Sequence, residues 1–309
     1  ADRVNEVLES VPTIVDPPQF GAETSVTAGI ANAANVAATA NIADASTSDQ
    51  TEGKAKSGRE AGGTRLEFAD ITFSYPGAEA PAIRNASFEA NPGEVTAIIG
   101  GTGSGKSTLV NLIPRFYDVD SGAILIDGVD VRQMTQRELR ERIGLVPQKA
   151  VLFSGSVADN IRFGKGDATE DEVVHAAEVA QALEFISEMS AGFDSPIAQG
   201  GTNVSGGQKQ RLAIARALVR KPDILVFDDS FSALDYRTDA RLRAALREDI
   251  RDATVLIVAQ RVSTVIDAER IIVLDEGQVV GNGTHKQLME TSKVYREIVL
   301  SQLTEEEVA

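Results

Sequence analysis

The fold of this chain is decided by the stretch Gly100-Gly101-Thr102-Gly103-Ser104-Gly105-Lys106-Ser107, which Thr108 follows. The stretch fits G-x-x-x-x-G-K-[ST] in full, and the apolar residues 94–99 before it have the pattern of a strand. Its glycines let the backbone curl so that N–H groups converge on phosphate oxygens, and a helix expected over about 105–116 adds the positive end of its dipole. The order of strand, loop and helix favours a phosphate-binding loop over a chance glycine-rich turn.

Two acids follow an apolar run later in the chain, and the first of them is the natural partner of this loop. Residues 224–227 read as a buried strand that ends in Asp228 and Asp229. In the loop pattern, Lys106 reaches the β- and γ-phosphates of a nucleotide and the Ser107 hydroxyl is a ligand of Mg²⁺. We expect the strand to lie beside the loop strand and to aim Asp228 at the same Mg²⁺ through water.

The composition excludes several classes of protein. The 309 residues hold 46 Asp and Glu against 30 Lys and Arg, for a net charge of −16, so the chain lacks the electrostatic footprint of a general nucleic-acid binder. It has no cysteine, which rules out disulfides and thiolate chemistry, and its two histidines are too few for a multi-histidine metal site. No apolar run is long enough to span a bilayer.

Composition also divides the chain into parts. Residues 1–15 place apolar side chains at helical spacing, whereas residues 16–63 are rich in Ala, Asn, Thr, Ser and Gly and cannot bury a core, so we expect a flexible linker there. Residues 64–303 alternate strand and helix patterns, which predicts an α/β sheet with an antiparallel part at the front. A short acidic tail, residues 304–309, ends the chain.

A second anion site is indicated by the stretch Val204-Ser205-Gly206-Gly207-Gln208-Lys209-Gln210-Arg211. Ser205 is placed to cap a helix, and Gly206 and Gly207 leave the first backbone N–H groups of that helix exposed. A plain helix cap would need neither both glycines nor a second phosphate motif in the same chain. The stretch therefore points to a second contact with phosphate.

Together the two stretches resemble the ATP-binding cassette (ABC) ATPases, and the resemblance runs from about residue 66 to residue 303. It implies an α/β fold with a P-loop NTPase (RecA-like) core, an antiparallel β subdomain and an ABC-specific α-helical subdomain at about 150–220, with ATP and Mg²⁺ as cofactors. The residues that it implies at the nucleotide are Tyr75, Gly100, Gly101, Thr102, Gly103, Ser104, Gly105, Lys106, Ser107, Thr108, Gln148, Ser205, Gly206, Gly207 and Gln208. Those implied at the metal are Ser107, Gln148 and Asp228, and those implied in hydrolysis are Lys106, Asp229 and Gln260.

The resemblance also implies how these residues work. Tyr75 matches the aromatic that stacks on adenine, Gln148 matches the Q-loop glutamine that touches Mg²⁺ and senses the membrane domain, and residues 232–235 match the D-loop. In the family two cassettes pair head to tail, and each ATP lies between the phosphate loop of one cassette and the signature of the other, which is 205–208 here. One chain therefore contributes to two sites.

Three further stretches resemble exporters in particular. Residues 152–161 resemble the segment after the Q-loop, Gln199–Gly201 resembles the X-loop that contacts the transmembrane domain, and residues 1–15 resemble the cytoplasmic end of a last transmembrane helix. The resemblance implies a membrane transporter with its cassettes on the cytoplasmic side of the cell membrane. Contact with the transmembrane domain would run through Gln148 and Gln199–Gly201, and the acidic charge predicts no nucleic-acid partner.

Two residues depart from the family pattern, and both stand at positions that act in ATP hydrolysis. The family has Glu after the metal-binding Asp and a switch histidine later, whereas this chain has Asp229 and Gln260. The Asp side chain is one methylene shorter than Glu, so its carboxylate lies about 1.5 Å closer to the backbone. A displacement of about 1 Å in a catalytic group can cost about 100-fold in rate. Gln can donate a hydrogen bond, but unlike His it cannot become a cation. This pattern resembles the degenerate subunit of heterodimeric exporters, in which one site turns over slowly while an intact signature serves the site of the partner.

Other assignments stay open at this stage. A non-transport ABC ATPase is one of them, although such members usually carry a coiled-coil, zinc or basic insertion that this chain lacks. A homodimeric ATPase and a regulatory cassette that only dimerises with ATP are the others. Activity that appears only on mixing with a partner would favour the heterodimer.

Overall fold

The computed structural model describes residues 14–17 and 63–302, which belong to one structural unit. The helix predicted over residues 1–15 and the linker predicted over 16–63 lie almost entirely outside these residues, and the acidic tail 304–309 lies wholly outside them. These three predictions stay predictions. Among the residues described, no helix has both the length and the apolar character needed to cross a membrane.

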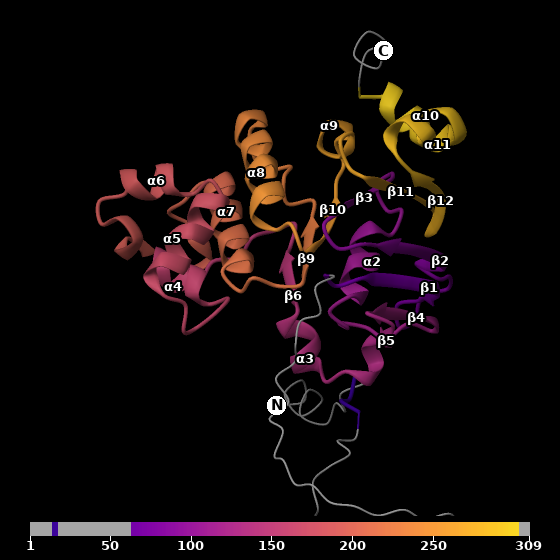
Figure 1. Cartoon of the computed structure of the whole chain (residues 1–309), viewed down its shortest axis with the longest axis horizontal. Helices are drawn as coiled ribbons and strands as arrows, with labels where there is room; N and C mark the ends of the chain where they lie inside the picture. The colour runs from indigo at the N-terminus through magenta and orange to yellow at the C-terminus, as the bar shows by residue number, and fades with distance from the viewer. Residues whose placement is uncertain (1–13, 18–62, 303–309) are drawn as a thin grey trace, which may run out of the picture. The chain divides into compact units, whose positions relative to one another are not determined.

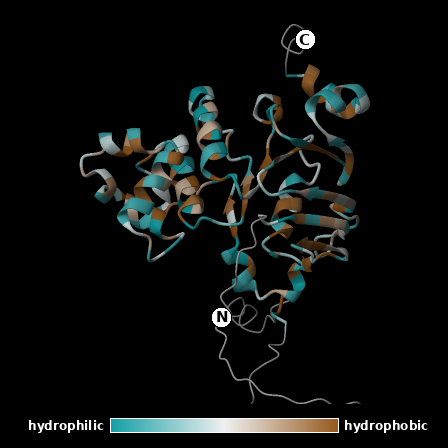
Figure 2. Cartoon of the chain, in the orientation of Figure 1, coloured by the Kyte–Doolittle hydropathy of each residue, from teal (hydrophilic) through white to brown (hydrophobic). Residues whose placement is uncertain are grey.

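A six-stranded sheet carries the phosphate loop (Figure 1). Its strands lie in the order β12-β11-β3-β10-β9-β6, and all neighbours are parallel except β11 and β12, which form a hairpin. Their bounds are β3 Val95–Ile99, β6 Ile143–Val146, β9 Ile224–Asp228, β10 Thr254–Val258, β11 Arg270–Asp275 and β12 Gln278–Gly283. The strands are among the most hydrophobic parts of the chain (Figure 2), as expected for strands that are covered on both faces.

The strand that carries Asp228 does not lie beside the loop strand, so that expectation was wrong. β10 lies between β3 and β9 and is parallel to both. Chain order does not fix strand order in a parallel sheet, because a crossover connection can place a later strand between two earlier ones. Asp228 nevertheless reaches the phosphate loop, because the Ser107 hydroxyl donates a hydrogen bond of 3.0 Å to Asp228 Oδ1.

The antiparallel part predicted at the front is a separate four-stranded sheet in the order β2-β1-β4-β5. Its strands are β1 Leu66–Phe73, β2 Ile83–Ala90, β4 Ser121–Ile126 and β5 Val129–Asp130. The β4–β5 hairpin turns at Asp127 and Gly128, which have φ angles of 53° and 79°. This Asp-Gly pair has the left-handed geometry that two-residue hairpins need.

Helix α2 (Lys106–Leu112) starts in the phosphate loop and is shorter than the helix expected over about 105–116. Pro114 has no N–H to donate to Val110 O, and the N–H of Ile113 bonds to that carbonyl instead, at 3.3 Å. Arg115 then takes a φ of 54°, which ends the helix. The proline therefore ends α2 four residues earlier than the periodicity of the sequence suggests.

Most of the remaining helices lie on the face of the six-stranded sheet opposite α2, or follow its last strands in the chain (Figure 1). They are α3 Gln136–Glu141, α4 Val157–Arg162, α5 Glu170–Val179, α6 Leu183–Glu188, α7 Gly206–Leu218, α8 Tyr236–Asp249, α9 Val262–Val265, α10 His285–Thr291 and α11 Lys293–Leu300. Helices α4 to α7 form what we call the helical region, which lies to the left of β6 and β9 in Figure 1. They fall within the range in which a helical subdomain is predicted.

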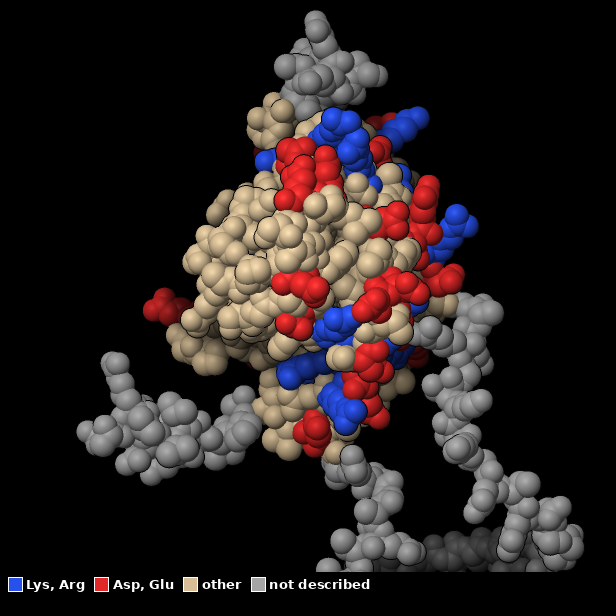
Figure 3. Space-filling view, turned by 90° about the vertical axis from the view of Figure 1, so that its left-hand side faces the viewer, with Lys and Arg blue, Asp and Glu red and all other residues tan. Residues whose placement is uncertain are grey.

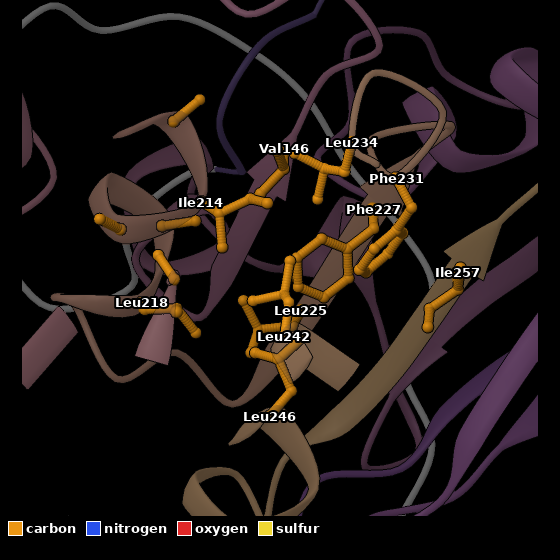
Figure 4. Close-up of a cluster of buried hydrophobic side chains, with 14 of the residues drawn as sticks. Val146, Ile214, Leu218, Leu225, Phe227, Phe231, Leu234, Leu242, Leu246 and Ile257 are labelled. Carbon is orange, nitrogen blue, oxygen red and sulfur yellow. The ribbon is translucent and has the colours of Figure 1, made fainter. Parts of the chain in front are cut away.

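Alternate residues of the central strands fill two different cores. Val226 and Leu256 pack with α2 and the antiparallel sheet. Leu225, Phe227 and Ile257 point the other way and pack with α7 and α8 (Figure 4). The two-residue period of a strand thus explains why these runs are apolar at every position.

Replacing Leu225 by Ala should destabilise the domain by about 2–5 kcal/mol, because the residue is 0 % exposed within a buried cluster and its truncation would leave a cavity. Urea unfolding followed by circular dichroism measures the change. Val129→Ala is the control, since Val129 is 42 % exposed and its truncation should change the free energy of unfolding by less than about 0.5 kcal/mol. Equal destabilisation by the two variants would contradict the packing described.

Candidate active site

Four of the predicted site segments follow the carboxyl ends of neighbouring strands. The phosphate loop follows β3, Gln148 follows β6, Asp229 follows β9 and Gln260 follows β10. The carboxyl ends of parallel strands meet at one edge of a sheet, and this edge is where open α/β sheets bind ligands. The fold itself therefore brings together residues that are up to 160 positions apart in the chain.

Two glycines of the phosphate loop are required by their surroundings. A Cβ on Gly100 would lie 2.0 Å from the carbonyl oxygen of Leu274, so the loop passes too close to β11 for any side chain there. Gly105 caps α2 with a φ of 101°, and a Cβ on it would lie 2.8 Å from Ile83 Cδ1. The backbone can take this course only with glycine at both positions.

Lys106 lies across the phosphate loop. Its ammonium group donates hydrogen bonds to Gly100 O at 2.8 Å and Gly101 O at 2.7 Å. Burial lowers the pKa of Lys106 from its ordinary value, while the charges of Asp229 and Asp228 act in the opposite direction. The lysine thus places a cation between the loop and the paired acids.

Ser107 and Asp228 bring a hydroxyl oxygen and a carboxylate oxygen together at the start of α2. Their side chains are joined by the hydrogen bond of 3.0 Å, and Asp228 is only 7 % exposed. Burial raises the pKa of the Asp228 carboxyl; the bond from Ser107 opposes this rise, and the charge of Asp229 adds to it. A hydroxyl and a carboxylate are hard oxygen donors of the kind that Mg²⁺ prefers, so these two residues fit the predicted metal.

Asp229 is held by both of the glutamines that the sequence singles out. Gln148 Nε2 donates to Asp229 Oδ2 at 2.9 Å, and Gln260 Nε2 donates to the same oxygen at 2.8 Å. The residue follows directly after β9 with a left-handed φ of 47°, and its N–H donates to Val258 O. Nothing in the sequence indicates this joint contact, because the resemblance assigns the two glutamines to other partners.

Tyr75 lies next to the phosphate loop, on the segment after β1. Its hydroxyl is 3.0 Å from Thr108 Oγ1, and its ring meets Tyr117 edge-on with 5.3 Å between centroids. Tyr75 is 37 % exposed, so part of its side chain is open to solvent. Tyr117 was not predicted at this site, although an aromatic residue just beyond α2 could have indicated it.

The signature does not join this group of residues. Ser205 and Gln208 cap α7 reciprocally: Ser205 N–H donates to Gln208 Oε1 at 2.9 Å, and Gln208 N–H donates to Ser205 Oγ at 3.3 Å. Figure 1 shows α7 and α2 on opposite sides of β6 and β9. Gly206 is exposed, and a Cβ there would meet nothing within 4 Å. The start of α7 is thus open to a group that comes from outside this chain.

Three comparisons with known proteins agree with this geometry. Residues 83–232 match the family described as ABC transporter. An uncharacterised ABC transporter ATP-binding protein of Mycobacterium tuberculosis is 51 % identical over 240 residues, which are 77 % of this chain and 41 % of that protein. The ATP-dependent lipid A-core flippase of Vibrio vulnificus is 45 % identical over 230 residues, which are 74 % of this chain and 40 % of the flippase.

The solved structure of a bacterial Atm1-family ABC exporter with ATP bound is also similar, with a TM-score of 0.76 and 39 % identity over 79 % of this chain and 43 % of that one. The fold is therefore the P-loop ATPase fold of the ABC type, with its antiparallel sheet and helical subdomain, which confirms the predicted fold class. The chain is a nucleotide-binding domain of the ABC transporter family, homologous to the ATP-binding domains of exporters. It spans about two fifths of the length of the relatives named above.

Proposed function

We propose that the chain is the nucleotide-binding domain of an ABC exporter, which binds Mg-ATP and pairs head to tail with a second, different cassette. The names of two relatives support export: one is the lipid A-core flippase, and the other is a β-(1→2)glucan export ATP-binding/permease protein of Rhodopseudomonas palustris, 45 % identical over 244 residues. The separation of α2 from α7 supports the head-to-tail pair, because the signature of this chain lies away from its own phosphate loop.

Nucleotide binding is assigned to the loop edge of the sheet. Tyr75 would offer its partly exposed ring to adenine, the loop N–H groups and Lys106 would hold the phosphates, and Ser107 with Asp228 would hold Mg²⁺. When bound, Mg²⁺ offsets the charge of the β- and γ-phosphate oxygens during transfer. Gln148 follows β6 at the same edge of the sheet, so we also propose it as a contact of the metal. In this structure its amide donates a hydrogen bond to Asp229.

We also propose that this site hydrolyses ATP slowly, and the hydrogen bonds to Asp229 are the observation that supports this most directly. The carboxylate at the position of the catalytic Glu is one methylene shorter, and two amides already occupy its Oδ2. A carboxylate that orients an attacking water needs a free oxygen within about 3 Å of it. The two hydrogen bonds fix the orientation of this shorter carboxylate, so Asp229 could turn toward a water only by giving them up.

The open end of α7 completes the proposal. In the pair, Ser205, Gly206, Gly207 and Gln208 would contact the γ-phosphate of the ATP held by the partner. These residues depart in no way from the family signature, unlike Asp229 and Gln260. The partner would supply Glu and His at the two altered positions, so that most hydrolysis takes place at its own phosphate loop.

A transmembrane domain is the other partner that we propose, with the cassettes on the cytoplasmic side of the membrane. The X-loop is tied to the segment after the Q-loop, because Gly200 N–H donates to Leu152 O at 3.0 Å. Beside it, Phe153 and Phe163 lie 4.4 Å apart and are 43 % and 66 % exposed. Figure 3, which faces the helical region, shows a broad area without charged side chains. The two exposed phenylalanines suit a protein partner, and a face without a broad basic patch (Figure 3) does not suit a nucleic acid.

The test of the proposed function is the ATPase activity of the chain alone and in the complex that it forms in its source membranes. The chain alone should hydrolyse ATP at least about 100-fold more slowly than the complex. Robust activity of the chain alone would contradict the proposal and favour a homodimeric ATPase. Recovery of a soluble complex without any membrane protein would favour a non-transport ABC ATPase.

A further inference from the structure

The side chain of Gln302 holds the backbone of the switch loop, which we define as Gln260–Val262. Gln302 Nε2 donates a hydrogen bond to Gln260 O at 2.8 Å, and Gln302 Oε1 accepts one from Val262 N–H at 2.9 Å. One amide side chain thus satisfies a carbonyl and an N–H that lie on either side of Arg261. These contacts join parts of the chain that are 42 and 40 positions apart.

The helix that presents Gln302 is firmly placed. Tyr295 and Val299 of α11 are both 0 % exposed, and the Tyr295 hydroxyl is 2.8 Å from His285 Nδ1 on α10. The Ser292 hydroxyl caps the helix by accepting from Tyr295 N–H at 3.2 Å. At the other end, Gln302 N–H bonds to Val299 O at 3.0 Å. The reach of the Gln302 side chain is therefore set by a packed helix and not by a free chain end.

The other contacts of the switch loop lead to the site. Gln260 Nε2 donates to Asp229 Oδ2 at 2.8 Å, and Arg261 Nη2 donates to Ser232 O in the D-loop at 3.3 Å. Gln260 is therefore held from both directions, by its side chain at Asp229 and by its carbonyl at Gln302. Gln260 itself is exposed, so buried packing does little to hold it in place.

We propose that Gln302 is a positioning residue, which fixes the switch loop and thereby sets where the Gln260 amide lies. Its consequence for nucleotide binding rests on the proposed function, together with the expectation that the Gln260 amide, at the position of the switch histidine, faces the γ-phosphate of bound ATP. The C-terminal helix then contributes to how the site distinguishes ATP from ADP. Linkage also works in reverse, so that ATP at the site steadies the contact between the loop and α11.

The first measurement reads the contact itself by amide hydrogen exchange of Val262 in the full chain. Gln302→Ala removes both bonds and should speed this exchange about fivefold, the effect of losing one ordinary hydrogen bond. Gln302→Glu keeps an acceptor for Val262 N–H but cannot donate to Gln260 O, so it should speed the exchange less. Ser301→Ala is the matched control, because among the described residues the Ser301 hydroxyl is hydrogen-bonded to Ile298 O of α11 and not to the switch loop. Unchanged exchange in Gln302→Ala would overturn the proposal.

The second measurement compares the affinities for ATP and ADP in the presence of Mg²⁺. Gln302→Ala and Gln302→Glu should each weaken ATP binding about threefold and leave ADP binding unchanged, whereas general damage would weaken both. Gln260→Ala should have a similar effect, and the double variant Gln260→Ala/Gln302→Ala should be no worse than Gln260→Ala alone. Additive losses in the double variant would overturn positioning through Gln260. If Gln260→Ala leaves the ratio of the two affinities unchanged, the proposed role of Gln260 fails, and the exchange of Val262 alone decides on Gln302.

Discussion

An aspartate in place of Gly206 should reduce ATP hydrolysis by the assembled transporter about 100-fold or more, and at the same time leave the fold of this chain intact. Gly206 is the first residue of α7, and a Cβ at this position would meet no atom within 4 Å. A carboxylate in the first turn is favourable to a helix, but it would repel a γ-phosphate that approaches the same N–H groups. Loss of one such anion contact costs about 100- to 1000-fold in comparable sites.

Gly206→Asn is the matched control for this prediction, because it adds a side chain of the same size without the charge. The Asn variant should retain a larger share of the activity, and both variants should unfold at the same urea concentration as the wild type or a higher one. Steady-state ATPase of the complex and ATP binding by the isolated chain are the two measurements. Normal hydrolysis by the Asp variant would show that the signature of this chain serves no active site.

Replacing Lys106 by Met should weaken ATP binding by this chain at least about 30-fold, which corresponds to about 2 kcal/mol. The ammonium group is held over the loop by Gly100 O and Gly101 O and lies near the paired acids. Its removal leaves Asp228 and Asp229, each 7 % exposed, without their nearby cation. Bound phosphate would then meet two carboxylates instead of a lysine.

Calorimetric titration with Mg-ATP measures the loss, and Lys286→Met serves as the control because Lys286 is an exposed residue of α10. The control variant should bind ATP like the wild type. Similar affinities in Lys106→Met and the wild type would contradict the assignment of the phosphate loop.

The individual strands, helices and loops of this domain can be predicted from local sequence pattern, whereas the order of the strands in the sheet cannot. The phosphate loop is recognisable because its glycines, Lys106 and Ser107 have one joint explanation, and the Asp127-Gly128 hairpin needs no tertiary information. The place of β10 between β3 and β9 depends on a crossover, which is a property of the whole sheet. Only the folded chain could show it.

The hydrogen bonds within the candidate site could not be predicted from the sequence either. The sequence marks Gln148, Asp229 and Gln260 one by one, yet their shared hydrogen bonds depend on the left-handed turn at Asp229 and on three separate strand ends. Gln302 has no motif of its own around it, and its role becomes visible only when α11 is packed beside the switch loop. Motifs therefore locate the groups that contact a ligand better than the residues that position those groups.

We propose that ATP hydrolysis at this chain's own site is slow because of Asp229 and Gln260. The Gly206→Asp variant of the complex gives direct access to that site, because the site of the partner is then silent. In this background, single-turnover hydrolysis should rise about 100-fold when Asp229→Glu and Gln260→His are added together. An unchanged rate, or a residual rate already close to that of the wild-type complex, would contradict the claim.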